Sequence, residues 1–115
     1  MSVNTDYPAS NAEIRKHVGQ LGKNQGALMQ GFQALHQGAL KEGSLDLKTK
    51  ELIALAVAVA GRCDDCIGMH VEASLKAGAS RDEIEEMLGV CIMMGGGPSL
   101  MYATHVLSAV EQFSA

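Results

Sequence analysis

Apolar residues recur at intervals of three and four along almost the whole chain, which is the spacing of amphipathic helices. One such stripe predicts a helix over about residues 24–42; it consists of Leu28, Phe32, Leu35 and Ala39. No segment alternates between apolar and polar residues in the way that a half-buried strand requires. The pattern therefore predicts an all-α protein.

Capping signals place the first helix near the N-terminus. Ser10 and Glu13 have the spacing of a capping box, which predicts a short helix that ends at about Gln20. We expect residues 1–9, which precede this box, to form a loose arm.

The third predicted helix carries the most continuous apolar sequence of the chain. Gly43 ends the second helix, and Asp46 can cap a third over about residues 47–60, before Gly61. After Glu51 this segment is apolar on all sides, so we expect it to be central and buried.

Three further helices follow from the same signals. The fourth begins at a pair of cysteines and ends at about Ala77. Ser80 opens a second capping box, which predicts a helix to about Met94. Pro98 suits the first turn of a last helix, which ends at about Phe113. We therefore predict a compact bundle of about five to six helices, in one domain over residues 1–115.

The composition adds an expectation about assembly. The chain has 115 residues, of which 47% are hydrophobic, 3% aromatic and only 19% charged. A net charge of only −4 together with this hydrophobicity argues against disorder. A chain with few charges and many apolar residues is expected to expose apolar surface unless it associates, which favours a homo-oligomer.

Charge and hydropathy exclude two classes of partner. The chain is acidic, and it lacks both a Lys/Arg cluster and the aromatic residues on which bases stack, so we expect no nucleic acid partner. Its longest apolar run extends from Leu52 to Ala60, which is about half of the roughly 20 residues that a membrane span needs. We therefore expect no membrane association. The first ten residues do not resemble a signal peptide, and we expect a cytoplasmic protein.

The spacing of the cysteines is the most informative feature. Cys63 and Cys66 form a C-x-x-C pair, and three cysteines in a cytosolic protein are not a disulfide framework. At about 100° per residue, Cys63, Cys66 and His70 share an arc of roughly 60° on the helix surface, with Asp65 on the opposite, solvated side. Cys66 and His70 are four residues apart, close enough for a hydrogen bond directly or through one water.

These positions suit thiol redox chemistry. The unpaired N–H groups and dipole of a first helical turn favour a thiolate, which is the nucleophile in disulfide exchange and in attack on peroxide. A second thiol then resolves the sulfenic acid into a disulfide. Helix-terminus physics alone favours Cys63 as the more acidic thiol.

Two other interpretations of the cysteine helix stay open. Cys63, Cys66 and His70 could supply three ligands of a structural zinc site, although no second Cys/His pair follows. A catalytic metal with Glu51 as the fourth ligand is a further alternative. The cysteine pair could also be inert and buried. Cys91 lies in the apolar run from Val90 to Met94, and we interpret it as an inert residue that fills space in the core, here called a filler residue.

Glu51 is the one acidic residue at the start of the apolar helix. It could be solvated, or paired with Lys48 or Lys50. Alternatively, because the chain returns through Gly61 to the cysteines, a carboxylate removed from water there could relay a proton.

The remaining histidines carry weaker signals. His17 and His36 lie in the glycine-spaced N-terminal region, where we expect solvated side chains. His105 is in line with Tyr102 and Ala109 on the last helix, where it could form a pocket wall.

Taken together, these residues resemble the AhpD-like (alkylhydroperoxidase D-like) branch of the carboxymuconolactone decarboxylase superfamily. The resemblance spans about residues 40–105 and is carried by the run that begins at Glu51, by Cys63-x-x-Cys66 with His70, and by the Ala77-Gly78-Ala79-Ser80 turn with Glu83-Ile84. It implies an all-helical fold and symmetric oligomers, commonly trimers or hexamers.

The resemblance also implies an activity and roles for four residues. As in AhpD-like enzymes, Cys66 would attack a hydroperoxide, and Cys63 would resolve the product and exchange with a dithiol or protein reductant of the lipoyl or thioredoxin type. Glu51 and His70 would form a proton relay. The implied function is a peroxidase or disulfide oxidoreductase of antioxidant defence that needs no cofactor and no metal. Asp65 stands where well-known members carry a further histidine.

Two alternative functions remain. A cofactor-free decarboxylase or lactone-processing enzyme would match the branch that names the superfamily, but that chemistry does not require a C-x-x-C pair. The chain could also be a non-enzymatic redox-sensing or metal-binding module.

Overall fold

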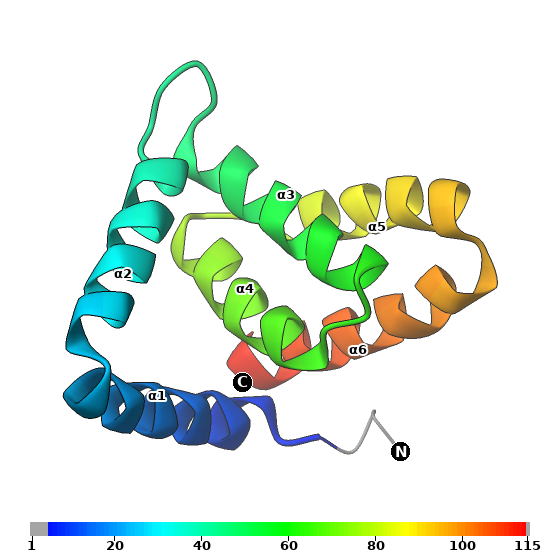
Figure 1. Cartoon of the computed structure of the whole chain (residues 1–115). Coiled ribbons are helices and arrows are strands. Elements are labelled where there is room, and N and C mark those ends of the chain that lie inside the picture. Colours follow the sequence, from blue (N-terminus) through cyan, green and yellow to red (C-terminus); the bar gives the residue numbers. More distant parts are fainter. Residues whose placement is uncertain (1–4, 115) are drawn as a thin grey trace.

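The chain forms a bundle of α-helices, seen in a computed structural model that describes residues 5–114 (Figure 1). These residues contain six helices and no strand, as the hydrophobic pattern predicts. The helices are α1 (Tyr7–Asn24), α2 (Gly26–Leu40), α3 (Leu47–Ala60), α4 (Asp64–Lys76), α5 (Arg81–Gly95) and α6 (Gly97–Ser114). None of the helices in this part of the chain is long and apolar enough to cross a membrane.

The core lies among the four C-terminal helices. Helices α4 and α5 each pack against both α3 and α6. Helix α1 crosses α4, and α2 lies at the edge of the molecule (Figure 1). The fully buried aliphatic side chains of this core come from all four helices: Leu55, Val59, Ile67, Val71, Ile84 and Val106. The C-x-x-C helix is thus the central element of the fold.

Two predicted helix starts are confirmed by their caps. The Asp46 carboxylate accepts a hydrogen bond from the Thr49 N–H at 2.8 Å, and α3 begins at the next residue. Ser80 and Glu83 form a complete capping box, in which each side chain accepts from the other residue's N–H. Such caps satisfy N–H groups that the first turn of a helix leaves unpaired.

The start of α1 differs from the prediction. Asp6, not Ser10, caps this helix by accepting from the Ala9 N–H at 3.1 Å. The expected loose arm is therefore wrong for residues 7–9, which form the first turn of α1; residues 1–4 lie outside the described part of the chain. The local reason is the Asp6 cap, which is followed by Pro8 in the first turn. A tertiary contact adds to it, because the buried Tyr7 donates its N–H to the Gln112 side chain of α6 at 2.7 Å.

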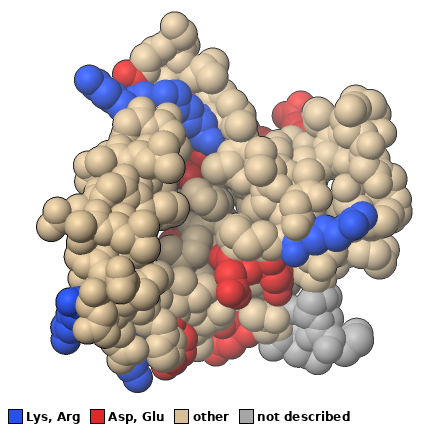
Figure 2. Space-filling model, viewed as in Figure 1, with Lys and Arg blue, Asp and Glu red and all other residues tan. Residues whose placement is uncertain are grey.

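Helix α3 also differs from its prediction as a fully buried helix. Leu55 and Val59 are buried, but Ile53 and Val57 are 48% and 64% exposed, because the neighbouring helices cover only part of its surface. The apolar stripe of α2 is exposed as well. Most of the face seen in Figure 2 carries neither acidic nor basic side chains. Many of the apolar side chains that the composition contains are thus exposed on the surface of the single chain.

Candidate functional site

A contact between a buried carboxylate and an imidazole links the first turns of α3 to the middle of α4. The Glu51 Oε1 and the His70 Nδ1 lie 2.7 Å apart, and the Glu51 side chain is only 7% exposed. With the carboxylate as acceptor, Nδ1 is the donor in this contact, and Nε2 is then the ring nitrogen that can act as a base. The pair has the arrangement of a histidine base with an orienting carboxylate.

The alternative partners of Glu51 are occupied elsewhere. The Lys48 ammonium contacts the Glu83 carboxylate at 2.8 Å. The Lys50 ammonium donates to the carbonyl oxygens of Ala39 and Lys41. The interpretation of Glu51 as solvated or paired with these lysines is therefore wrong, and its carboxylate faces His70.

The cysteine pair forms the start of α4. Gly61 ends α3, Arg62 turns the chain with a positive φ of 55°, and Cys63 is the N-cap residue of α4. The Cys63 Sγ accepts from the Cys66 N–H at 3.2 Å, and the two sulfurs are joined in a disulfide. Both residues are half-buried. A sulfur at this position faces the N–H groups that favour a thiolate after reduction.

One cavity brings Cys66, His70 and Glu51 together. Its volume is about 420 Å³, and helices α1 to α4 supply its walls. The hollow beside α2 in Figure 2 shows how open this side of the molecule is. Cys63 is not among the wall residues, and within residues 5–114 no direct hydrogen bond joins Cys66 to His70. The fold thus gathers three of the four predicted site residues around one space. Cys63 is outside this lining, and its N–H donates to the Ala58 carbonyl oxygen near the end of α3 at 3.0 Å.

Sequence reasoning missed the contribution of α2 to this cavity. His36 and Phe32 both line it, and their rings stack with centroids 6.5 Å apart. A second cavity of about 630 Å³ shares Phe32, His36 and Met69 with the first and continues along α2. The i,i+4 spacing of Phe32 and His36 is the one signal in the sequence; their place in the wall of the Cys66 cavity depends on how α2 packs.

The rim of the cavity is charged. The Arg15 guanidinium contacts the Glu72 carboxylate at 2.6 Å, and the Asn11 side chain donates to the same oxygen at 3.0 Å. These donors, Arg15 foremost, hold the pKa of Glu72 below its usual value. Asp65 is exposed, as the helical wheel predicts, but it lines the same cavity as Cys66 and His70 and does not lie on the opposite side.

The other predicted histidines lie elsewhere. His105 does not line the cavity of Cys66; it is 8% exposed, and its Nδ1 lies 3.1 Å from the Asp64 Oδ1. His17 is exposed on α1, where it contacts Glu13 and Gln20, in agreement with the expected solvated side chain.

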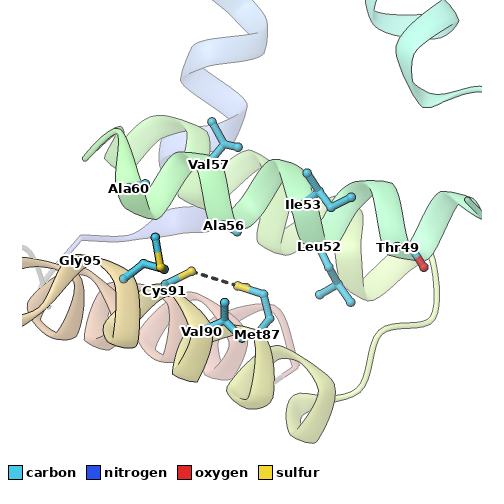
Figure 3. A pocket seen from close by; sticks show the side chains of 11 residues that line it. Thr49, Leu52, Ile53, Ala56, Val57, Ala60, Met87, Val90, Cys91 and Gly95 are labelled. Atoms are coloured by element: carbon cyan, nitrogen blue, oxygen red, sulfur yellow. Dashed lines mark hydrogen bonds between the residues drawn. The ribbon is translucent and has the colours of Figure 1, made fainter.

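Cys91 has the surroundings of a filler residue. It is half-buried in α5, its Sγ lies 3.5 Å from the Met87 Sδ, and burial raises the pKa of its thiol. It lines an apolar cavity of about 540 Å³ between α3 and α5, shown in Figure 3. Within the part of the chain that the structure describes, no group of three or more His, Cys, Asp or Glu side chains could hold a metal ion.

Comparison with known proteins assigns the family. Residues 26–109, which include α2 to α5 and most of α6, match the model of the carboxymuconolactone decarboxylase family. The chain belongs to this family. The match contains the whole constellation of Glu51, the cysteine pair and His70.

Solved structures of the family have the same fold. An apo carboxymuconolactone decarboxylase family protein of Legionella pneumophila is 47% identical, with a TM-score of 0.92 over 95% of this chain and 97% of that one. A protein of Thermotoga maritima, described with a suggested role in the antioxidative response, is 32% identical, with a TM-score of 0.70 over 76% and 91%. An uncharacterized protein of Cupriavidus necator is 40% identical over 111 residues, 96% of this chain and 98% of that one.

Proposed function

We propose that this family member reduces hydroperoxides with its cysteine pair and regenerates the pair with a dithiol or protein reductant. The observation that carries the proposal is the buried Glu51–His70 pair in the cavity of Cys66. The suggested antioxidative role of the Thermotoga maritima relative supports it. Because the cycle needs reducing partners, we also propose the cytoplasm as its location.

The first step would be the attack of Cys66 on the hydroperoxide. His70 takes the thiol proton at Nε2, while the Glu51 carboxylate stabilises the resulting imidazolium. The Cys66 sulfur bonds to the distal peroxide oxygen, the O–O bond breaks, and the alkoxide takes the proton back from His70. The products are an alcohol and a sulfenic acid on Cys66.

The remaining steps would return the dithiol. The Cys63 sulfur attacks the Cys66 sulfenic acid, an S–S bond forms, and hydroxide leaves as water with the proton of Cys63. This product is the Cys63–Cys66 disulfide of the structure. A reductant thiolate then attacks Cys63, Cys66 leaves as a thiolate, and the second reductant thiol releases Cys63. One hydroperoxide and one dithiol thus give one alcohol, one water and one disulfide.

Peroxide turnover tests this proposal. Consumption of an organic hydroperoxide is followed in parallel with a lipoyl dithiol, thioredoxin and a small thiol. We expect Cys66→Ser to abolish turnover and Cys63→Ser to accumulate a sulfenic acid that dimedone traps, while Cys91→Ser, the matched control, keeps full activity. Full turnover by both Cys66→Ser and Cys63→Ser would disprove the thiol cycle.

Two alternatives make different predictions for the same samples. A decarboxylase or lactone-processing enzyme, favoured by the family assignment alone, would retain its activity in the double variant Cys63→Ser/Cys66→Ser. A metal-binding module would contain stoichiometric zinc in untagged protein, and a zinc-bound thiolate pair would not be free for the cycle.

We also propose that the protein is a homo-oligomer, in line with the trimers or hexamers that the family resemblance implies. The apolar groove of Figure 3 has Ile53 and Val57 on α3 and Val90 and Met94 on α5, all about half exposed or more. Exposed apolar surface of this kind marks association sites. Sedimentation should show an oligomer for the natural chain and monomers for Val57→Asp, while Ala12→Asp, on the exposed side of α1, should not change the mass. A monomeric natural chain would refute the proposal.

A further inference from the structure

An apolar groove between α2 and α4 continues from the cavity of Cys66. Helix α2 packs against α1 and α3, but in the described part of the chain none of its Cα atoms lies within 8 Å of a Cα atom of α4 (Figure 1). The cavity of about 630 Å³ along α2 has walls from α1, α2 and α4, and it shares Phe32, His36 and Met69 with the cavity of Cys66. We call this second cavity the α2 groove, whose apolar walls are Val18, Leu28, Met29, Phe32 and Met69.

The two cavities offer a ligand different groups. The cavity of Cys66 contains the groups that react in the proposed cycle, namely the sulfur and the Glu51–His70 pair. The α2 groove offers mainly aliphatic, thioether and aromatic side chains, with His36 and two glutamines as the polar exceptions. Ligand sites commonly combine apolar walls with a few polar groups that fix the orientation of the ligand. A substrate with a polar reacting head and an apolar tail fits the two cavities together.

The space is far larger than hydrogen peroxide needs. A molecule of liquid water takes up about 30 Å³, and hydrogen peroxide adds only one oxygen atom to it. The cavity of Cys66 alone has a volume of about 420 Å³. From Leu28 to His36 the wall of the α2 groove extends about 12 Å, at about 1.5 Å per residue. An extended alkyl chain advances about 1.3 Å per carbon, given C–C bonds of about 1.5 Å, so about nine carbons span this length.

The side chains of the groove have apolar surface that the single chain leaves uncovered. Leu28 is 63% exposed and Phe32 is 57% exposed. Met29 and Met69 have unbranched, polarizable side chains that adapt to the shape of a ligand. An alkyl tail along these side chains would remove their apolar surface from water while its head stays at Cys66.

A second copy of the chain is a less suitable occupant of the α2 groove. The groove opens into the cavity of Cys66, which a surface for association does not require. The apolar surface that we assign to association lies instead between α3 and α5 (Figure 3).

We infer that the α2 groove binds the tail of the substrate, and that the preferred substrates are hydroperoxides with an unbranched alkyl chain of about eight or more carbons. Leu28 and Phe32 are specificity-determining residues that contact the tail and take no part in the chemistry. The inference rests on the proposed thiol cycle and names its substrate class. Because these contacts are the same before and during the reaction, they strengthen binding and leave the rate at saturation unchanged.

Primary hydroperoxides from butyl to octyl test this inference, since all have the same O–O bond and the same kind of leaving group. Burial of one methylene group strengthens binding about fourfold, and we expect about twofold in a half-open groove. In Cys63→Ser protein, the second-order rate constant of sulfenic acid formation should therefore rise about tenfold from butyl to octyl hydroperoxide. The rate at saturation should stay constant. A second-order rate constant that does not depend on chain length would overturn the inference.

Leu28→Asp places a charge in the groove, and Leu35→Asp is its matched control. Leu35 belongs to the same helix, is 68% exposed against 63% for Leu28, and does not line the groove. We expect Leu28→Asp to remove the preference for octyl over butyl hydroperoxide, because an apolar tail would have to desolvate the carboxylate. Leu35→Asp should keep the preference, and equal effects of the two changes would overturn the inference.

Sedimentation of the same two variants tests the competing occupant. A smaller mass for Leu28→Asp than for Leu35→Asp would assign the α2 groove to a second copy of the chain and would overturn the inference. Equal masses, together with a loss of the chain-length preference in Leu28→Asp alone, support the tail site.

The alcohol products separate this outcome from that of the proposed function. In Cys63→Ser/Cys91→Ser protein, alkylation of Cys66 by iodoacetamide needs neither a hydroperoxide nor a reductant. We expect octanol to protect Cys66 at about a tenfold lower concentration than butanol. Protection by octanol in a protein without peroxide turnover would retain the alkyl-chain site and refute the proposed function. Full turnover without any effect of chain length would retain the proposed function and refute this inference.

Discussion

Glu51 and His70 are 19 residues apart in the chain, and their side chains meet at 2.7 Å with the carboxylate almost fully buried. The contact depends on the short turn at Gly61 and Arg62, which returns α4 along α3. A carboxylate held in this way orients the imidazole, fixes its tautomer and stabilises its protonated form. The relationship is the basis of the proposed proton relay.

Substitution of Glu51 by Gln should slow the attack on peroxide. Gln keeps an oxygen that can accept from His70 but removes the charge that stabilises the imidazolium, so we expect a loss of tenfold or more, on the order of magnitude of general-base effects. The second-order rate constant for sulfenic acid formation in Cys63→Ser protein measures this. Glu86→Gln, at an exposed position of α5, is the control and should not change the rate. An unchanged rate in Glu51→Gln would reduce the buried pair to a structural role.

Cys91 should react more slowly than an ordinary thiol. Burial raises the pKa of its thiol, so less thiolate is present at a given pH. In the double variant Cys63→Ser/Cys66→Ser, alkylation at pH 8 should be several-fold slower in the folded protein than in urea, on the order of tenfold. Equal rates in the two conditions would contradict the interpretation of Cys91 as a packed filler.

The contact between α1 and α4 should not tolerate a side chain at Gly68. A Cβ at this position would lie 2.8 Å from the Asn11 Oδ1 and 2.9 Å from the Tyr7 ring, so Gly68→Ala should force the two helices apart and lower the free energy of unfolding by about 1–3 kcal/mol. Gly89→Ala is the control, since nothing lies within 4 Å of its Cβ position in the middle of α5. This second change should be neutral or raise stability by up to about 1 kcal/mol. Urea denaturation of both variants distinguishes the two effects.

The Arg15–Glu72 pair should contribute to stability only above acidic pH. Because Arg15 and Asn11 hold the pKa of Glu72 below its unfolded value, the stabilisation is present above the unfolded pKa of about 4.3 and is lost as the pH falls through the folded pKa. We expect Arg15→Ala to cost up to about 1 kcal/mol at pH 7, since the Arg15 side chain is half exposed, and to cost nothing near pH 2.

Denaturation curves at several pH values measure this difference. Lys16→Ala, the neighbouring exposed cation of α1, should show no such dependence on pH. A constant cost of Arg15→Ala at every pH would mean that the side chain acts through packing rather than charge.

Local chemistry made four helix starts predictable. Asp46, the cysteine pair, Ser80 and Pro98 each lie at the beginning of the helix that they predict, because caps and first-turn residues act within four positions of the chain. The start of α1 also has a local signal, the Asp6 cap with Pro8 in the first turn, and the prediction chose the Ser10 box instead. The first residue of α1, Tyr7, is anchored to Asp64 and Gln112, which are 57 and 105 residues away.

The residues of the candidate site also fall into two groups: those that local spacing brings together and those that only the packing of the helices brings together. The periodicity of one helix predicted a shared face for Cys66 and His70, and both line one cavity. Cys63 is the extended N-cap residue of α4 and lies outside this lining. The choice of His70 over Lys48 or Lys50 as the partner of Glu51 required the packing of α3 on α4. The place of His36 in the cavity required the return of α2.

By itself, the sequence determined the helical class, most helix boundaries and the common face of Cys66 and His70, because each depends on interactions between residues a few positions apart. Only the tertiary structure decided which charges surround the two sulfurs. Glu51 and Asp64 are both acidic residues near a helix start, and nothing local distinguishes them. Packing gives Glu51 the imidazole of His70 and gives Asp64 the phenol of Tyr7 and the ring of His105, because contacts across helices depend on how the whole bundle closes.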